Sequence, residues 1–184
     1  TMSAVTSDNF AGGRKVAEFL IAGGHKKIGF CAGWEGASTQ RDREAGFLAS
    51  LKDAGIELHC REVGNFKMEE ARAATLRMFA SDPPDAIFVA NDHMAIAVMD
   101  TLRSELDLDV PKDVSVVGYD DVPAAAWPAF NLTTVRQPVN RMVAETVDIL
   151  LQQIANTSTQ PRKIKIDGPL IVRGSARAPE GWRR

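Results

Sequence analysis

Two adjacent carboxylates, Asp120 and Asp121, follow directly after an apolar segment of this 184-residue chain. The segment, residues 114–117, has the valines of a buried strand, and it is expected to stop at Gly118 and open into a loop that begins with Tyr119. Open α/β sheets bind their ligands just beyond the carboxyl ends of such strands. The pair of acids therefore predicts a binding site for a small molecule at this point of the chain.

Polar side chains follow the other predicted strands in the same way. Because the carboxyl ends of parallel strands share one edge of a sheet, these side chains are expected to converge. Arginine, amide and carboxylate groups pair with hydroxyls or ring edges, and an aromatic ring covers an apolar face, so the set suits a polyhydroxylated or heterocyclic ligand. The residues are Ser38, Thr39, Arg41 and Arg43 after the first strand, Phe66 after the second, Asn91 and Asp92 after the third, and Tyr119, Asp120 and Asp121 after the fourth.

Each candidate also has a purely structural interpretation. Arg43 could pair with a neighbouring acid on a solvated helix, and Phe66 could belong to the core. Asn91 or Asp92 is expected to cap the following helix, which leaves the other one free to face the ligand. Two tryptophans could stack on a ligand, or serve packing or an interface instead: Trp34 and Trp127.

The sequence does not contain the residue patterns on which most enzymes depend. Its three histidines, His25, His59 and His93, are scattered, and no serine or cysteine has a suitably spaced base partner. The sequence contains no GxGxxG motif, no phosphate-binding glycine–lysine loop and no metal-ligand spacing. Asp120 and Asp121 could hold a divalent cation, but no other carboxylate cluster supports this. We therefore expect no enzymatic activity, no metal and no cofactor.

Four short apolar strands alternate with helices and would carry the candidate residues. Ser7 and Asp8 cap the first helix, and a pair of glycines at 23 and 24 ends it. Strands joined by a single crossover helix run parallel, and the crossovers are right-handed. The sequence therefore predicts an α/β fold, a doubly wound and mostly parallel sheet with helices on both faces. The strands are expected at residues 27–32, 60–63, 86–90 and 114–117.

The last third of the chain departs from this alternation. Its proline, glycine and polar residues separate short segments of different periodicity. We expect an extended segment at 132–135, an amphipathic helix from Pro138 to Ile154, a polar linker at 156–161, two short strands at 163–166 and 170–172, and a loose tail after 175.

Composition limits the classes of protein to which the chain can belong. The formal net charge is −2, and the 22 Lys and Arg residues form no long basic cluster, so this chain is not expected to bind DNA by itself. Two cysteines are too few for a disulfide framework, and Cys31 lies in an apolar run as a buried free thiol would. The sequence shows no secretory signal and no apolar run long enough for a membrane helix, so we expect a cytoplasmic protein without membrane contact.

Several segments, taken in order, resemble the effector-binding core of the lactose-repressor/galactose-repressor (LacI/GalR) family of bacterial transcription regulators. Their order and spacing match the family across nearly the whole chain, which makes the set far more specific than any single segment. The matching segments are Ser7-Asp8-Asn9, Gly24-His25-Lys26-Lys27-Ile28, Arg43-Glu44-Ala45-Gly46-Phe47, Ala90-Asn91-Asp92-His93-Met94-Ala95, residues 111–121 (PKDVSVVGYDD), residues 132–138 (LTTVRQP) and Leu170-Ile171-Val172-Arg173.

The resemblance implies a fold similar to the type I periplasmic sugar-binding proteins, in which two Rossmann-like lobes joined by three crossovers hold the effector between them. By that comparison the chain lacks the DNA-binding head and most of the amino-terminal lobe. The implied division is a crossover remnant at 1–7, the carboxyl-terminal lobe at 8–130, a crossover and helix of the amino-terminal lobe at 131–157, return strands to the carboxyl-terminal lobe at 158–175, and a tail at 176–184.

The resemblance also implies site residues and partners. The effector would be a small molecule similar to a carbohydrate, a sugar or sugar acid, and the protein a homodimer that reaches operator DNA only through the head. A periplasmic sugar-binding subunit of an ABC-type transporter shares the fold and is the alternative. The implied effector contacts are Arg43, Phe66, Asn91, Asp120 and Gln137, with Ser38, Trp34 and Asp121 as further candidates, and the implied dimer contacts are Ala95, Met99, Leu102 and Trp127.

Overall fold

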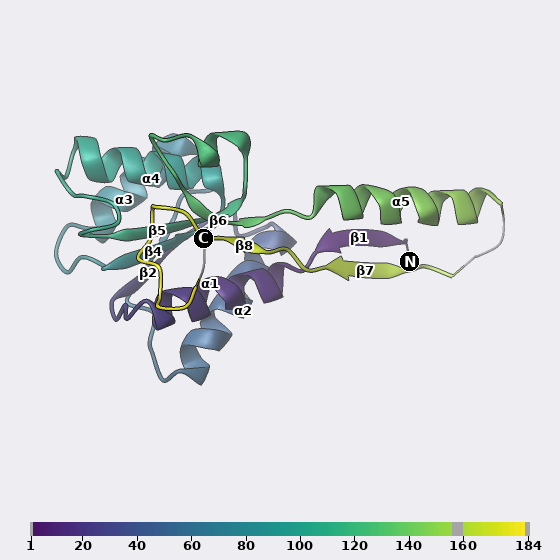
Figure 1. Cartoon of the computed structure of the whole chain (residues 1–184), viewed down its shortest axis with the longest axis horizontal. Helices are drawn as coiled ribbons and strands as arrows, with labels where there is room; N and C mark the ends of the chain where they lie inside the picture. The colour runs from purple at the N-terminus through teal and green to yellow at the C-terminus, as the bar shows by residue number, and fades with distance from the viewer. Residues whose placement is uncertain (1, 156–159, 183–184) are drawn as a thin grey trace.

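The computed structural model describes residues 2–155 and 160–182 and consists of two parts (Figure 1). The larger part is an α/β body built on a six-stranded sheet. The smaller part, which we call the arm, extends from one end of the body and contains a two-stranded sheet and one long helix.

The sheet of the body confirms the predicted doubly wound, mostly parallel architecture. The strand order is β3-β2-β4-β5-β6-β8, and every neighbouring pair is parallel except β6 and β8. All residues of β2 and β4 are buried, as expected of strands covered on both faces. The bounds are β2 Ile28–Ala32, β3 Cys60–Val63, β4 Ala86–Val89, β5 Ser115–Asp120, β6 Thr133–Arg136 and β8 Leu170–Ile171.

Helices cover both faces of this sheet (Figure 1). The first pair, α1 (Asn9–Ala22) and α2 (Ser38–Asp53), packs together on one face, and α3 (Met68–Met78) and α4 (Asp92–Ser104) pack together on the other. The Asp8 side chain caps α1 by accepting a hydrogen bond from the Ala11 amide, as the sequence predicted. A short 3₁₀ helix, η1 (Pro123–Ala126), connects β5 to β6.

Strand β5 is longer than the sequence indicated. It continues through Gly118 to Asp120, and the Tyr119 side chain is wholly buried instead of lying in a loop. The reason is pairing with β6, since Gly118 lies opposite Thr134 and Asp120 lies opposite Arg136. A glycine that appeared to end the strand therefore lies in its interior, where it allows another group to approach closely.

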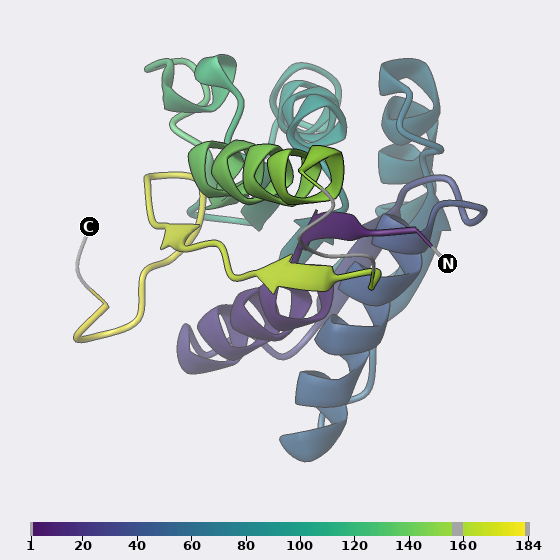
Figure 2. The same cartoon turned by 90° about the vertical axis from the view of Figure 1, so that its right-hand side faces the viewer.

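The arm contains a strand that the sequence analysis missed. Strand β1 (Ala4–Ser7) pairs in parallel with β7 (Lys163–Ile166), and α5 (Val139–Ile154) packs over this two-stranded sheet (Figure 2). The division of the chain implied by the resemblance is therefore wrong for β7, because only β8 returns to the body. The physical reason is that β1, from residues 1–7, gives β7 a ladder partner outside the body. The expected boundary at 157/158 and most of the polar linker lie outside the described residues.

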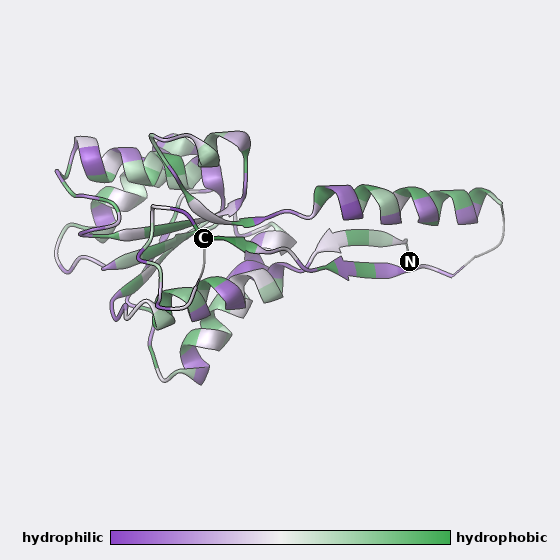
Figure 3. Ribbon diagram, viewed as in Figure 1, coloured by the Kyte–Doolittle hydropathy of each residue, from purple (hydrophilic) through white to green (hydrophobic). Residues whose placement is uncertain are grey.

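Helix α5 carries the predicted apolar stripe (Figure 3). Only Ile149 on this helix is buried, while Leu151 and Ile154 are 60% and 77% exposed. The helix contacts β1 and β7 on one side alone, so its outer face is apolar and exposed to solvent in the described chain.

The segment after 175 is packed onto the body and is not a loose tail. The Ser175 hydroxyl donates to the Val116 carbonyl and accepts from the Thr133 amide, so it joins β5 to β6. Farther along, Trp182 packs edge-on against Phe19 of α1 with ring centroids 5.3 Å apart. These nonlocal contacts fix the segment as far as 182, and the last two residues lie outside the described part.

Candidate functional site

Arg43 is the centre of a buried polar cluster at the carboxyl edge of the sheet. Its Nε donates to Asn9 Oδ1 (2.9 Å), Nη1 to the Ala90 carbonyl (2.6 Å) and Nη2 to Asp120 Oδ1 (3.2 Å). The guanidinium also stacks over the Tyr119 ring, 3.7 Å from its centroid, which is a cation–π geometry. Arg43 is only 4% exposed, so the alternative of a solvated surface arginine is wrong. We call Arg43, Asn9, Tyr119, Asp120 and Gln137 the Arg43 cluster.

Glycines in two helices allow Arg43 to reach this place. A Cβ at Gly13 of α1 would overlap the Arg43 carbonyl oxygen, and one at Gly46 of α2 would overlap the Phe10 carbonyl oxygen. The backbones of α1 and α2 therefore approach more closely than larger residues would permit. Gly12 likewise leaves room for the Tyr119 ring, because a Cβ there would overlap its hydroxyl.

Asp120 connects Arg43 to the segment after β6. Its Oδ1 accepts hydrogen bonds from Arg43 and from Gln137 Nε2 (2.9 Å), and its carbonyl accepts from the Gln137 amide (3.3 Å). Among the described residues Asp120 Oδ2 has no partner, and its side chain is 27% exposed. Gln137 Oε1 is buried and also finds no hydrogen-bond partner there. Both oxygens are therefore acceptors that the surrounding described residues leave open.

The cluster lies where the strand order of the sheet changes direction. From β2 the chain passes to β3 on one side and then returns to β4 on the other, so β2 and β4 flank the switch point. Arg43 belongs to α2, which follows β2, and its bond to the Ala90 carbonyl reaches the end of β4. Ligands of open α/β sheets bind outside the strand ends at this point. The structure thus brings Arg43, Asn91 and Asp120 to one edge, as the order of the strands predicts, and Gln137 lies beside Asp120 there.

One of Asn91 and Asp92 caps the following helix, as expected, but the other does not face the ligand site. Asn91 caps α4, because its Oδ1 accepts from the Met94 amide at 3.0 Å. Asp92 is wholly buried instead of facing the site, and it accepts from Thr134 Oγ1 (2.6 Å) and the Val122 amide (2.9 Å). Burial raises the pKa of Asp92 to about 7, against the lowering effect of these two hydrogen bonds.

Asp121 forms ion pairs with two arginines and makes no hydrogen bond to the Arg43 cluster within the described residues. It pairs with Arg136 at 2.5 Å and with Arg173 at 2.7 Å, and its side chain is only 6% exposed. The adjacent acids therefore differ in role, since Asp121 ties β6 to the segment after β8 while Asp120 belongs to the Arg43 cluster. Consecutive positive φ values of 118° and 58° at these two positions direct the chain out of β5.

Three further candidates lie in loops or at the start of a helix, and within the described residues they make no hydrogen bond or ring contact with the Arg43 cluster. Phe66 is half-buried in the loop before α3 and lies against Gly33, where a Cβ would overlap its ring. Trp34 is 60% exposed and folds over Gly36 of its own loop. Ser38 is exposed at the first position of α2.

Asn9 is a member of the Arg43 cluster that the sequence did not predict, and Tyr119 lies elsewhere than predicted. Asn9 follows the α1 cap directly, and its Oδ1 binds Arg43 while its Nδ2 donates to the Ser7 carbonyl. Tyr119 was expected to present a ring to the ligand, but its ring supports Arg43 from within the core. An asparagine just inside a helix cap and an aromatic within a strand were the only signals available.

Three of the four implied dimer contacts are wrong. Ala95, Met99 and Leu102 are wholly buried within α4, facing the sheet and α3 of the same chain. A residue without exposed surface cannot contact a second chain. Trp127 differs, because it is 58% exposed and stacks on Phe130 with ring centroids 6.4 Å apart.

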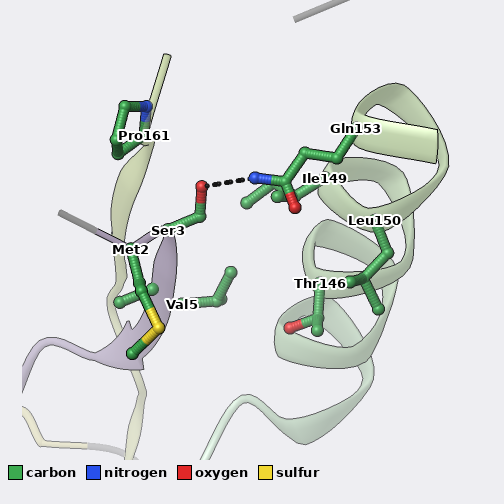
Figure 4. A pocket seen from close by; sticks show the side chains of 9 residues that line it. Met2, Ser3, Val5, Thr146, Ile149, Leu150, Gln153 and Pro161 are labelled. Carbon is green, nitrogen blue, oxygen red and sulfur yellow. Dashed lines mark hydrogen bonds between the residues drawn. The ribbon is translucent and has the colours of Figure 1, made fainter. Parts of the chain in front are cut away.

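A cavity of about 370 Å³ lies in the arm, between β1 and α5 (Figure 4). Gln153 Nε2 donates to the Ser3 hydroxyl at 3.2 Å across it, and Ile149 and Leu150 line the helix side. None of the predicted effector contacts lines this cavity. Within residues 2–155 and 160–182, no cluster of three or more acids, histidines or cysteines is arranged for a metal ion, and no helix is long and apolar enough to span a membrane.

Comparison with known proteins defines the class. Residues 17–176 match the family model described as a periplasmic binding protein-like domain. The HTH-type transcriptional repressor PurR of Photobacterium profundum is 33% identical over 169 residues, which cover 90% of this chain and 50% of that protein. The chain belongs to the periplasmic binding protein-like family and, within it, to the effector-binding domains of LacI/GalR transcription regulators.

Two solved structures place the chain within this group. A transcriptional regulator CelR–cellobiose complex has a TM-score of 0.88 and 33% identity, over 95% of this chain and 54% of that one. A dimeric Lac repressor with an 11-residue C-terminal deletion has a TM-score of 0.89 and 29% identity, over 97% and 65%. The chain spans about half the length of the curated relatives that it matches.

Proposed function

We propose that this chain is the small-molecule-binding part of a bacterial transcription regulator, in which an effector changes the affinity for operator DNA. The observation that carries the proposal is the position of the Arg43 cluster at the switch point of the sheet, in a chain that belongs to the family of LacI/GalR effector-binding domains. The charge of −2 and the scattered Lys and Arg residues support DNA contact by another part of the whole protein.

The effector is proposed to be a neutral, polyhydroxylated molecule such as a sugar. Arg43 and Asp120 carry opposite charges and pair with each other, so the cluster has little net charge to attract an anion. Asp120 Oδ2 and Gln137 Oε1 are open acceptors, which suit hydroxyl donors. Phe66 and Asn91 are proposed as further contacts, and Ser38 and Trp34 as candidates at the loop after β2.

A regulator is favoured over a transporter subunit because the three proteins compared above are named as a repressor or a regulator of transcription. The same comparison supports a protein that is not an enzyme. By analogy with the dimeric Lac repressor we propose a homodimer in the cytoplasm, with Trp127 at or near the contact.

Calorimetric titration of the whole regulator with a panel of D-glucose, D-ribose, cellobiose and the sugar acid D-galacturonate tests the proposal. We expect saturable binding of a neutral sugar that is weakened by Asp120→Asn and unaffected by Asp100→Asn, an exposed acid of α4. Binding that prefers the acid would refute the neutral effector. Binding of no sugar, or binding unaffected by Asp120→Asn, would refute the site.

A further inference from the structure

The buried carboxylate of Asp92 adjoins the Arg43 cluster but takes no part in it. Its two oxygens accept from two different segments, Oδ1 from the Thr134 hydroxyl of β6 and Oδ2 from the Val122 amide after β5. Those segments carry Asp120 and Gln137, the two residues of the cluster that present open acceptors. We infer that Asp92 is a positioning residue that fixes these two acceptors relative to each other, an inference that rests on the proposed function.

The bond to Val122 fixes the exit of the chain from β5. Asp120 and Asp121 have φ values of 118° and 58°, which are uncommon for non-glycine residues, and the value at Asp120 lies outside the left-handed region that aspartate adopts most readily. The Val122 amide is the first backbone donor after this pair, and Asp92 Oδ2 holds it at 2.9 Å. The direction in which the Asp120 carboxylate points therefore depends on an acceptor in α4, a separate element of the fold.

The bond to Thr134 fixes the neighbouring strand. Thr134 lies opposite Gly118 in the ladder, three residues before Gln137. A Cβ at Gly118 would overlap Asp92 Oδ1, so the glycine within β5 makes the space that the carboxylate occupies. This accounts for a glycine in the interior of a buried strand, where it otherwise weakens the sheet.

A carboxylate suits this position because each of its oxygens can accept a hydrogen bond. An amide has only one oxygen, so Asp92→Asn leaves one of the two donors facing an NH₂ group unless Thr134 rotates its hydroxyl. Asp92 is also the first residue of α4, where the amide end of the helix favours negative charge. Burial nevertheless favours the protonated form, as the raised pKa of Asp92 indicates.

Amide hydrogen exchange tests the inference independently of any ligand. We compare the wild-type protein with Asp92→Asn, with Thr134→Val, which removes only the hydroxyl, and with Asp100→Asn as the matched control on the same helix. At pH 8, above the pKa of Asp92, the carboxylate is ionised, and loss of a hydrogen bond to this charged group predicts exchange of the Val122 and Gln137 amides that is at least about tenfold faster in Asp92→Asn. Protection of the Phe30 amide in β2 is expected to stay unchanged, which separates positioning from general loosening of the fold.

Titration of the same variants with the sugar that the panel identifies provides the second measurement. Asp92→Asn and Thr134→Val are expected to weaken binding, the former by at least about tenfold, while Asp100→Asn binds as the wild type does. Unchanged exchange at Val122 and Gln137, or faster exchange spread equally to Phe30, would overturn the inference. So would unaltered affinity in Asp92→Asn. If the wild type binds no sugar, the proposed function fails, and the exchange pattern alone decides whether Asp92 positions the two segments.

Discussion

Replacing Asp120 by asparagine changes one of the two carboxylate oxygens, Oδ2, and leaves an acceptor oxygen in the place of Oδ1. Both protein donors, from Arg43 and Gln137, reach the same oxygen, Oδ1, at 3.2 and 2.9 Å. The asparagine oxygen can keep both bonds, so the substitution converts only Oδ2 from an acceptor into an NH₂ donor. Asparagine also tolerates the positive φ of 118° about as well as aspartate does, whereas alanine would add backbone strain.

The expected loss of affinity follows from that one oxygen. A hydrogen bond from a ligand hydroxyl to a charged acceptor contributes about 1.5–3 kcal/mol, which corresponds to about a 10- to 100-fold rise in Kd. The folded state loses its ion pair with Arg43, but the Asp120 side chain is 27% exposed and its hydrogen bonds remain. Because the Arg43 side chain is only 5% exposed and loses its counter-charge, the free energy of unfolding should fall by about 1–2 kcal/mol, the difference between hydrogen bonds to a charged and to a neutral acceptor.

Calorimetry at neutral pH and urea unfolding, made on the same preparations, separate the two effects. Asp100→Asn makes the same chemical change on an exposed acid of α4 and is expected to leave both quantities unaltered. A variant at position 120 that binds the sugar within about twofold of the wild type would refute Oδ2 as a ligand contact. A loss of several kcal/mol in stability would instead refute the argument that Oδ1 carries the structural bonds.

Three other perturbations follow from the same contacts. Arg43→Ala should lower the free energy of unfolding by about 2–4 kcal/mol in urea titrations, because buried acceptors lose their donors, while Arg41→Ala on the exposed face of α2 should change it little. Burial raises the pKa of Asp92 from 3.8 to about 7, with Asp120 and Asp121 adding to the rise, so protonation stabilises the fold and this contribution is lost as the pH increases. The unfolding free energy of the wild type minus that of Asp92→Asn should therefore decline between pH 5 and 8, by at most about 1.4 kcal/mol per pH unit, and a flat difference would contradict the shift. Gly46→Ala should lower the melting temperature measured by calorimetry, because its Cβ would overlap the Phe10 carbonyl; an unchanged melting temperature would mean that the two helices can separate without cost.

The sequence was sufficient for the body of the fold because its strands are fully buried. Runs such as those of β2 and β4 consist of apolar residues that alternate with capped helices, and parallel order follows from that alternation. The arm could not be found in the same way. Strand β1 has four residues with little apolar character, and its partner β7 lies near the other end of the chain, so only the three-dimensional pairing defines it.

Topology also explains which parts of the site were predictable. Arg43 and Asp120 were identified because every parallel strand delivers its following loop to the same edge. The burial of Arg43 was not predictable, since it depends on the close approach of α1 and α2 at Gly13 and Gly46. Helical periodicity likewise revealed an apolar stripe on α4 that includes Met99, but it could not show that the stripe faces its own sheet instead of a second chain.

Asp120 joins the proposed ligand site to the residues from which the arm begins. Its carbonyl accepts from the Gln137 amide and its carboxylate from the Gln137 side chain, and α5 begins two residues later at Val139. A ligand that binds Oδ2 therefore acts on the residue that also sets the start of the crossover. A ligand shifts a conformational equilibrium only by its difference in affinity for the two states. Asp121 is held by Arg136 and Arg173, so of the two adjacent acids only Asp120 has an oxygen that the described residues leave open to a ligand while it also binds Gln137. In the whole regulator, Gln137→Ala should therefore reduce the coupling between effector and DNA, measured as the change in operator affinity on adding effector, more than it reduces effector affinity. Equal losses in the two would argue against this route.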